Sequence, residues 1–185
     1  MINFNGVLTD KSDFITPSNR ALLYGDAVFE TFKVVDNKIL FLEDHYFRLM
    51  SSMRILRMKI PMNFTLEYLE EQIISLALKL NIANNARVRM TVFRKDGGLY
   101  APETNEVSFI ITAKENSSRE YLLKKENYEV ELFKDFHVSK HLISSLKTTN
   151  KIIQVVASVF AKENGFDDCI LINDEKNVVE TISGN

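Results

Sequence analysis

The chain has 185 residues, of which 45% are hydrophobic and 26% are charged, a balance that is ordinary for a globular protein. Its formal net charge of -2 argues against a nucleic acid or an anionic membrane as its main partner. The single cysteine, Cys169, excludes an internal disulfide and a multi-cysteine metal site, and we expect it to be buried. The first residues lack a signal-peptide pattern and no apolar segment has transmembrane length, so we expect a cytoplasmic protein.

The first half of the chain combines strand patterns with two helix patterns. Hydrophobic residues alternate where strands are expected and recur at helical spacing where helices are expected. In chain order, the predicted elements are a strand in residues 1–6, a hairpin over 28–42 that turns at Asp36 and Asn37, helices over 43–58 and from Thr65, and strands over 86–94 and 106–114. Gly97, Gly98 and Pro102 mark the turn between the last two strands.

The second half begins with a polar segment, ENSSREYLLKKEN, which predicts a linker and a domain boundary near residues 114–124. The predicted elements after it are strands over 128–136, 169–173 and 178–180, and a long helix that follows Lys147 and ends near Asn164, with Gly165 as its left-handed stop. The sequence therefore predicts a mixed α/β (α+β) chain of two domains, residues 1–118 and 119–185. The chain ends on Ser-Gly-Asn just after the last predicted strand, without a closing element, so we expect the second domain to be incomplete, truncated at its C-terminal end.

Lys147, in the stretch SSLKTTNKII, stands at the predicted start of this helix. Taken alone, it is most simply a hydrated surface lysine. A cation is nevertheless a poor choice at the N-terminal end of a helix, where the helix dipole favours anions. Leu142, Ile143 and Leu146 precede it, and an amine in partly apolar surroundings can act as a nucleophile toward a carbonyl group. Lys147 is therefore a candidate catalytic residue.

Glu180 and Arg48 are two further candidates. Glu180 closes a run of β-branched residues, where a buried carboxylate needs a cationic or hydrogen-bonding partner; the alternative is an exposed residue at a strand end. Arg48 could bind a phosphate with its planar fork, or form a salt bridge with Asp44 one helical turn earlier. Together, a lysine for an aldehyde, an acid for a pyridine nitrogen and an arginine for a phosphate meet the needs of pyridoxal phosphate.

Other patterns favour ordinary structural roles. His137 and His141 lie four residues apart but lack a third ligand, so we expect no metal site. Gly97 and Gly98 form a turn and match no phosphate-binding loop. Tyr100 follows in that turn and is a candidate for lining a pocket.

Three ordered blocks carry a resemblance to a known family. They are NRALLYGDAVFETFKVVDNKILFLEDHYFRL, SLKTTNKIIQVVASVFAKENGFDDCILIND and VVETISGN. With these blocks the sequence resembles the class IV aminotransferases, the fold-type IV pyridoxal phosphate enzymes, which include branched-chain aminotransferases, D-amino acid aminotransferases and 4-amino-4-deoxychorismate lyases. The resemblance implies that Lys147 forms the Schiff base with pyridoxal 5'-phosphate, that Glu180 keeps the pyridine nitrogen protonated, and that Arg48 binds the phosphate.

The resemblance also implies an architecture and a reaction. Residues 1–118 would form the smaller N-terminal α/β domain, and 119–185 the first part of the larger cofactor-binding domain, in a homodimer whose substrate enters between the domains. The implied function is that of an aminotransferase or a 4-amino-4-deoxychorismate lyase-like enzyme, acting on an amino acid, a keto acid or an amino-deoxychorismate-like substrate. Lys147, released as a free amine, would act as general base and acid. The alternative is a truncated, catalytically silent relative that acts as a dimeric binding or structural protein.

Details of the motifs separate the branches of the family. Branched-chain enzymes usually carry Phe-Glu-Gly-x-Arg where this chain has Phe-Glu-Thr-Phe-Lys, residues 29–33. D-amino acid enzymes resemble this chain in having a lysine at the Lys33 position. They usually bind the substrate carboxylate with a Tyr and an Arg-x-His, where this chain has Phe29 and Arg94-x-Asp.

The lyases are the most similar branch in these details, through Thr31, the turn over residues 94–100 and the Lys-Thr-Thr-Asn-Lys string over 147–151. The resemblance therefore slightly favours a lyase-like enzyme. It implies that the residues that bind the substrate are Phe29, Thr31, Arg94 and Tyr100.

Overall fold

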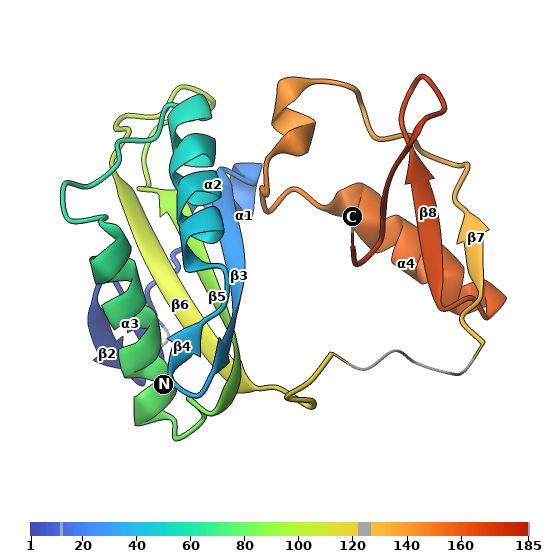
Figure 1. Cartoon of the computed structure of the whole chain (residues 1–185). Coiled ribbons are helices and arrows are strands. Elements are labelled where there is room, and N and C mark those ends of the chain that lie inside the picture. Colours follow the sequence, from blue (N-terminus) through green and yellow to red (C-terminus); the bar gives the residue numbers. More distant parts are fainter. Residues whose placement is uncertain (12, 122–126, 185) are drawn as a thin grey trace. The chain divides into compact units, whose positions relative to one another are not determined.

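The computed structural model describes residues 1–11, 13–121 and 127–184, which fall into two compact units (Figure 1). The first unit comprises Met1–Tyr121 together with Lys147–Thr149, and the second comprises Leu122–Leu146 and Asn150–Asn185. Each unit contains both helices and strands, so the predicted mixed α/β class is confirmed. The domain boundary expected between residues 118 and 119 stays a prediction. Among the described helices, none is both long and apolar enough to cross a membrane.

The first unit is built on an antiparallel sheet whose described strands have the order β2-β1-β6-β5-β3-β4. Its elements in chain order are β1 (Ile2–Phe4), β2 (Val7–Thr9), α1 (Arg20–Tyr24), β3 (Ala27–Val35), β4 (Lys38–Ile39), α2 (Leu42–Ile55), α3 (Leu66–Lys79), β5 (Asn85–Arg94) and β6 (Val107–Glu115). β3 pairs with β5 along its whole length, from Ala27 opposite Phe93 to Val35 opposite Asn85. Figure 1 shows α2 and α3 over one face of this sheet.

Alternation along β3 decides which side chains face the helices. Val28, Phe32 and Val34 are buried, whereas the alternate residues from Phe29 to Val35 are only half-buried, as in a strand with one face on a core. Glu30 lies in the buried row as well. The buried row packs against apolar residues of the two helices, which include Leu49, Met53, Leu69, Ile73 and Leu76. Burial of these large side chains is the main source of stability in the first unit.

The face of the sheet opposite α2 and α3 is called the open face below. On β3 it carries Phe29, Thr31 and Lys33, the alternate residues to the buried row. The register of β3 and β5 places Thr91, Arg89 and Arg87 directly opposite these three residues. Because paired residues in an antiparallel sheet share a face, two arginines of β5 lie on the same face as Phe29.

Local sequence signals set the ends of these elements. Thr65 caps α3 with its hydroxyl, which accepts from the Tyr68 N–H at 3.2 Å, as the sequence predicts. Asp36 and Asn37 turn the β3–β4 hairpin with φ of 49° and 62°, conformations that short polar side chains tolerate. The first predicted helix ends earlier than expected, at Ile55, because the chain reverses at Arg57 with φ 57°. The predicted extension of this helix to residue 58 is therefore wrong.

The second unit is a smaller sheet covered by one long helix. Its elements are β7 (Val130–Leu132), the 3-10 helix η1 (Leu142–Ser145), α4 (Ile152–Asn164), β8 (Asp168–Ile172) and β9 (Val178–Thr181). β7 pairs with β8 in parallel and β8 pairs with β9 antiparallel. The core consists of Phe133, Ala157, Ala161, Cys169 and Leu171. Gly165 ends α4 at φ 77°, and the predicted burial of Cys169 is confirmed, since its side chain has no exposed surface.

Candidate active site

Lys147 lies beside the edge of β3 and belongs to the first unit. The Phe29 N–H donates to the Lys147 carbonyl at 2.9 Å, and the Thr149 N–H donates to the Ala27 carbonyl at 3.1 Å. These bonds make an antiparallel bridge between Thr148 and Val28. Since α4 begins only at Ile152, the predicted position of Lys147 at the start of a helix is wrong. Strand pairing, not a helix, holds this lysine.

The Lys147 side chain is directed to the ring of Phe29. Its Nζ lies 4.8 Å from the ring centre, a distance at which an ammonium group is attracted to an aromatic face. The guanidinium carbon of Arg89 lies 3.6 Å from the same ring centre. Two cationic side chains therefore lie against the ring of Phe29 at the open face. The resemblance implies that Phe29 is a substrate contact.

Arg48 is held by a buried carboxylate that the sequence analysis did not single out. Its Nε donates to Glu30 Oε1 at 2.5 Å and its Nη2 donates to Glu30 Oε2 at 2.6 Å. His45 Nδ1 lies 2.8 Å from the same Oε2. The side chain of Glu30 is 1% exposed, whereas that of Arg48 is 47% exposed. The partner of Arg48 is thus Glu30 on β3 rather than Asp44 on its own helix.

Burial and pairing act in opposite directions on the Glu30 carboxyl group. Burial favours the neutral acid, but the hydrogen bonds from Arg48 and His45 outweigh it, so the pKa of Glu30 lies below its ordinary value. The same carboxylate raises the pKa of Arg48. The pair is therefore ionised throughout the physiological range, with a charged guanidinium at the surface. An acidic residue in the buried row of a strand is the sequence signal that would have found Glu30.

Glu180 lies on β9 in the second unit and is half-buried. It stands opposite Leu171 of β8, and its Oε1 accepts from the Gln154 amide of α4 at 2.6 Å. This bond fixes one carboxylate oxygen toward α4. In the described part of the chain, no cation pairs with Glu180 within salt-bridge distance.

Arg94 has a position that does not support the expected substrate contact. Its side chain is only 7% exposed, and its Nε donates to Asp26 Oδ2 at 2.9 Å. Its remaining nitrogens donate to the Leu56 carbonyl at 2.8 Å, to the Arg57 carbonyl at 3.4 Å and to Asn105 Oδ1. Since these bonds occupy all of its nitrogens, Arg94 serves the packing of β5 against the chain after α2.

Tyr100 lies in the turn that Arg20 holds in place. Arg20 Nη1 donates to the carbonyls of Gly97 at 3.1 Å and Leu99 at 2.5 Å, and its Nε donates to Asp26 Oδ2 at 2.9 Å. The Tyr100 side chain is 89% exposed, and its ring centre lies 5.6 Å from that of Tyr24. Within the first unit, Tyr100 is thus a surface residue on an anchored turn.

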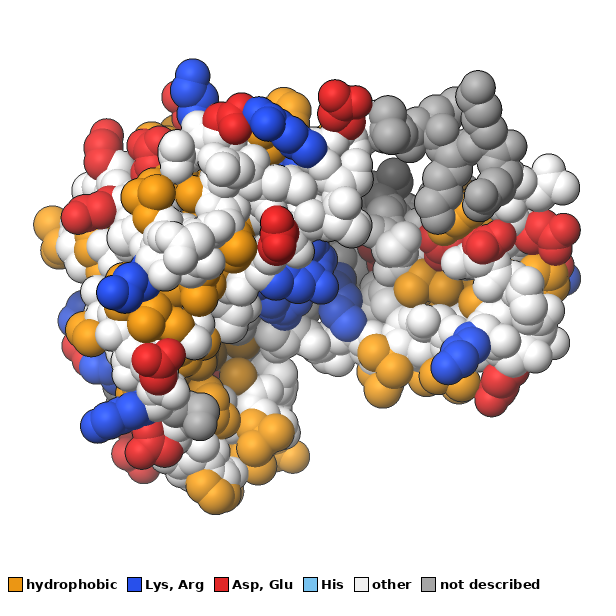
Figure 2. Space-filling view, turned by 90° about the horizontal axis from the view of Figure 1, so that it is seen from below, with side chains coloured by type: hydrophobic (Ala, Val, Ile, Leu, Met, Phe, Trp, Pro, Cys, Tyr) orange, Lys and Arg blue, Asp and Glu red, His pale blue; other side chains and the backbone are white. Residues whose placement is uncertain are grey.

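Arg87 and Arg89 are open-face residues that the sequence analysis missed. Among the residues that the structure describes, no carboxylate pairs with either guanidinium. Burial lowers the pKa of Arg89 from its usual range, and the nearby charge of Arg87 adds to that effect. Figure 2 shows Lys and Arg side chains gathered near the middle of its view. Cations in such a setting favour an anionic ligand.

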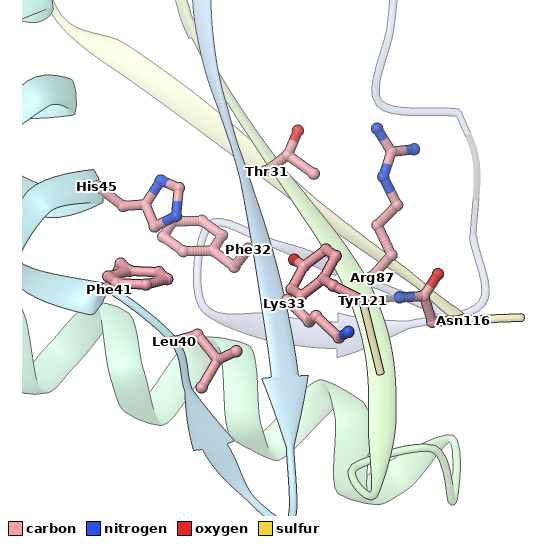
Figure 3. A pocket seen from close by; sticks show the side chains of 9 residues that line it. All are labelled: Thr31, Phe32, Lys33, Leu40, Phe41, His45, Arg87, Asn116 and Tyr121. Atoms are coloured by element: carbon pink, nitrogen blue, oxygen red, sulfur yellow. The ribbon is translucent and has the colours of Figure 1, made fainter. Parts of the chain in front are cut away.

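A pocket of about 380 Å³ wraps around the edge of β3 (Figure 3). Figure 3 shows Phe32, His45 and Phe41 on one side of the strand and Thr31, Arg87 and Tyr121 on the other. Thr31, an expected substrate contact, therefore lines a pocket, and Arg87 lines the same pocket. The signal for Arg87 and Arg89 was available in ARVRM, where two arginines share one face of a strand.

Comparison with known proteins identifies the family to which this chain belongs. The model of the family described as "Amino-transferase class IV" matches residues 27–185. A provisionally named branched-chain-amino-acid aminotransferase of Methanocaldococcus jannaschii is 26% identical over 197 residues, covering 100% of this chain and 63% of the relative.

Two solved structures share the fold. A branched-chain aminotransferase from the thermophilic archaeon Thermoproteus uzoniensis, with norvaline, has a TM-score of 0.83 at 22% identity, covering 98% of this chain. A provisionally assigned 4-amino-4-deoxychorismate lyase of Legionella pneumophila has a TM-score of 0.80 at 21% identity, covering 94% of this chain. The chain spans 62% of the length of each of these two structures.

Proposed function

The chain belongs to the class IV aminotransferase family, and from this premise we propose that it is a pyridoxal-phosphate-dependent enzyme with Lys147 as its catalytic residue. The observation that carries the proposal is the position of Lys147. Two backbone hydrogen bonds fix the lysine segment to β3, with its amine against Phe29, in the same unit as Arg48. A lysine with a purely solvating role would not need an extended segment paired to a strand edge.

The side chains present fit the chemistry of pyridoxal phosphate. Lys147 supplies a primary amine for the aldehyde. Arg48 is half exposed, and within the described residues no group occupies its Nη1, so the guanidinium can take a phosphate while Glu30 holds its other edge. Glu180 supplies a carboxylate for the ring nitrogen, with one oxygen already fixed by Gln154.

Each of these residues has a separate task in the proposed reaction. When bound, pyridoxal phosphate supplies an aldehyde that takes up the substrate amine and a ring that stabilises negative charge at the α-carbon. Lys147 holds the cofactor in the resting enzyme and then, as a free amine, moves the α-proton as general base and acid. Glu180 keeps a proton on the ring nitrogen, and Arg48 anchors the phosphate.

The open face supports an anionic substrate. Arg87 brings positive charge to the pocket that Thr31 also lines, and Arg89 lies on the same face of the sheet, against the Phe29 ring. The Arg89 Nε donates to Thr91 Oγ1 at 3.2 Å, which leaves its terminal nitrogens for a carboxylate. We therefore favour a carboxylate-rich substrate, such as an amino-deoxychorismate-like compound or an acidic amino acid, with either a transaminase or a lyase outcome.

Replacing Arg89 by glutamine should weaken the binding of such a substrate. Loss of a charge-assisted hydrogen bond of about 1.5–3 kcal/mol corresponds to a KM for the acidic substrate that is roughly 10- to 150-fold higher. Arg54→Gln is the matched control, because Arg54 is exposed on α2, away from the open face. Steady-state kinetics with acidic and uncharged amino acids would check this. An equal KM change for both substrate types would contradict a contact with the second carboxylate of the acidic substrate, because every amino acid carries an α-carboxylate.

The proposal is tested by the absorption spectrum of the purified protein with pyridoxal phosphate, before and after borohydride. We expect a visible band, and after reduction a cofactor mass on the peptide that contains Lys147. Lys147→Ala should lose both signals, whereas Lys151→Ala should keep them. Lys151 lies in the same segment, and its side chain makes no hydrogen bond that caps α4, so its removal leaves the segment in place. If the wild-type protein binds no cofactor at saturating pyridoxal phosphate, the enzyme proposal fails. The alternative, a catalytically silent relative that acts as a binding or structural protein, is then favoured.

The partner and location of the chain remain proposals of the same kind. We propose that it forms a homodimer, which light scattering of the purified protein would measure. The cytoplasmic location and the division at residues 118/119 likewise stay predictions.

A further inference from the structure

Glu30 is a buried charge whose role the proposed reaction leaves unexplained. Its side chain is 1% exposed, in the row of β3 that also contains Phe32 and faces α2. A carboxylate in such surroundings is costly unless its oxygens are paired. Three donors converge on it, namely Arg48 Nε, Arg48 Nη2 and His45 Nδ1. A large apolar residue would fill this position at no electrostatic cost, so the charge has another purpose.

The geometry of the pair fixes the orientation of the Arg48 guanidinium. The bidentate contact uses the edge formed by Nε and Nη2, which holds the guanidinium plane against β3. An arginine side chain otherwise loses substantial rotamer freedom when it binds a ligand. With one edge held, that loss has already occurred before a ligand arrives, and the Nη1 side of the half-exposed group is left for an anion.

His45 supports the carboxylate from the other side. Its ring packs edge-on against Phe32 at 4.9 Å between centres, and its Nδ1 lies 2.8 Å from Glu30 Oε2. Because an ionised carboxylate only accepts hydrogen bonds, we assign the Nδ1 proton to this contact. Arg48 Nη2 lies 3.1 Å from the same Nδ1, so the two donors meet at one oxygen rather than bonding each other. Glu30 is thus held by two side chains of α2.

We infer that Glu30 is a positioning residue that orients Arg48 toward the phosphate of the cofactor, with His45 as its support. The inference rests on the proposed function, in which Arg48 binds that phosphate. It adds that the affinity for the phosphate group depends on Glu30, a buried carboxylate on the opposite side of β3 from Phe29.

The test compares the affinities of the protein for pyridoxal phosphate and for pyridoxal, which lacks the phosphate. In Glu30→Gln, the preference for the phosphorylated compound should fall roughly 10- to 100-fold, as expected for loss of charged hydrogen bonds that orient Arg48. The affinity for pyridoxal should stay nearly constant. Glu43→Gln is the matched control, since Glu43 is an exposed residue on the same helix as Arg48.

A double-mutant cycle with Arg48→Gln shows whether Glu30 acts through Arg48. If it does, Glu30→Gln should cause no further loss of phosphate preference once Arg48 is replaced. Equal preference in wild type and Glu30→Gln, with a loss in Arg48→Gln, would overturn the inference and leave the proposed function intact. Absence of cofactor binding by the wild type would instead remove the proposed function.

A folding defect in Glu30→Gln would not end the test. Glu30→Asp keeps the charge but withdraws it by one methylene, so it should lose less stability and show an intermediate phosphate preference. Circular dichroism would establish that each variant is folded before titration. A folded Glu30→Asp with the full wild-type preference would show that the carboxylate position does not control Arg48, and would overturn the inference.

Discussion

Replacing Asp26 by asparagine should lower the free energy of unfolding by about 3–5 kcal/mol, because it breaks a buried ion network from one side. Asp26 Oδ2 accepts from Arg20 Nε and from Arg94 Nε, each at 2.9 Å. The two arginine side chains are only 4% and 7% exposed. An amide in place of the carboxylate would leave two buried guanidinium groups without a counter-charge. Urea denaturation followed by circular dichroism would measure the loss.

Asp36→Asn is the matched control for this prediction. Asp36 also pairs with an arginine, Arg119, but the two side chains are 56% and 57% exposed, and exposed pairs contribute about 0–1 kcal/mol. Asn also tolerates the left-handed conformation that residue 36 adopts. Equal losses of unfolding free energy in the two variants would contradict this prediction. They would mean that water screens the Asp26 network as it screens the exposed pair of Asp36 and Arg119.

The Asp26 network explains in physical terms why the first of the three sequence blocks contains Arg20 and Asp26. Asp26 lies just before β3, and it joins Arg20 of α1 to Arg94 at the end of β5. Arg20 in turn donates to carbonyls of the turn after β5. Asp26, which belongs to the first of the three blocks that resemble the family, therefore has a structural role within this unit.

Elements controlled by neighbouring residues were predictable from the sequence. Thr65 begins α3, Gly165 ends α4, and Asp36 and Asn37 turn the first hairpin, because each signal acts within a few residues of chain. Alternation likewise predicted the three long strands of the first sheet, β3, β5 and β6. The short helix α1 was missed, since a five-residue helix has too few apolar positions to show a period.

Side-chain partners across the fold were not predictable in the same way. Glu30 and Arg48 meet only because β3 lies under α2, and a helix pattern alone offered the nearer Asp44 as a partner. Arg94 was expected at the substrate, but its place at the end of β5 buries it among carbonyl groups. Lys147 was expected on a helix because the apolar run of α4 follows it closely, and only the edge of β3 explains its extended backbone.

Lys147→Ala should reduce turnover by roughly 10²–10⁴-fold through loss of the proton-transferring amine alone. Because the substitution also removes the group that holds the cofactor, the observed loss is expected at or beyond the upper end of that range. Lys151→Ala should retain nearly full activity. The measurement is the initial rate at saturating pyridoxal phosphate, so that weaker cofactor binding does not limit the variant.

Chemical rescue separates the two tasks of Lys147. Alanine leaves space beside Phe29, where the Lys147 Nζ lies 4.8 Å from the ring centre, and a small primary amine such as methylamine fits there. If Lys147 moves the α-proton, added methylamine should restore part of the rate in a saturable way, and only in Lys147→Ala. A variant that binds pyridoxal phosphate but gains no rate from any small amine would contradict the proton-transfer role. Lys147 would then serve to hold the cofactor, and the base would have to be another side chain at the open face.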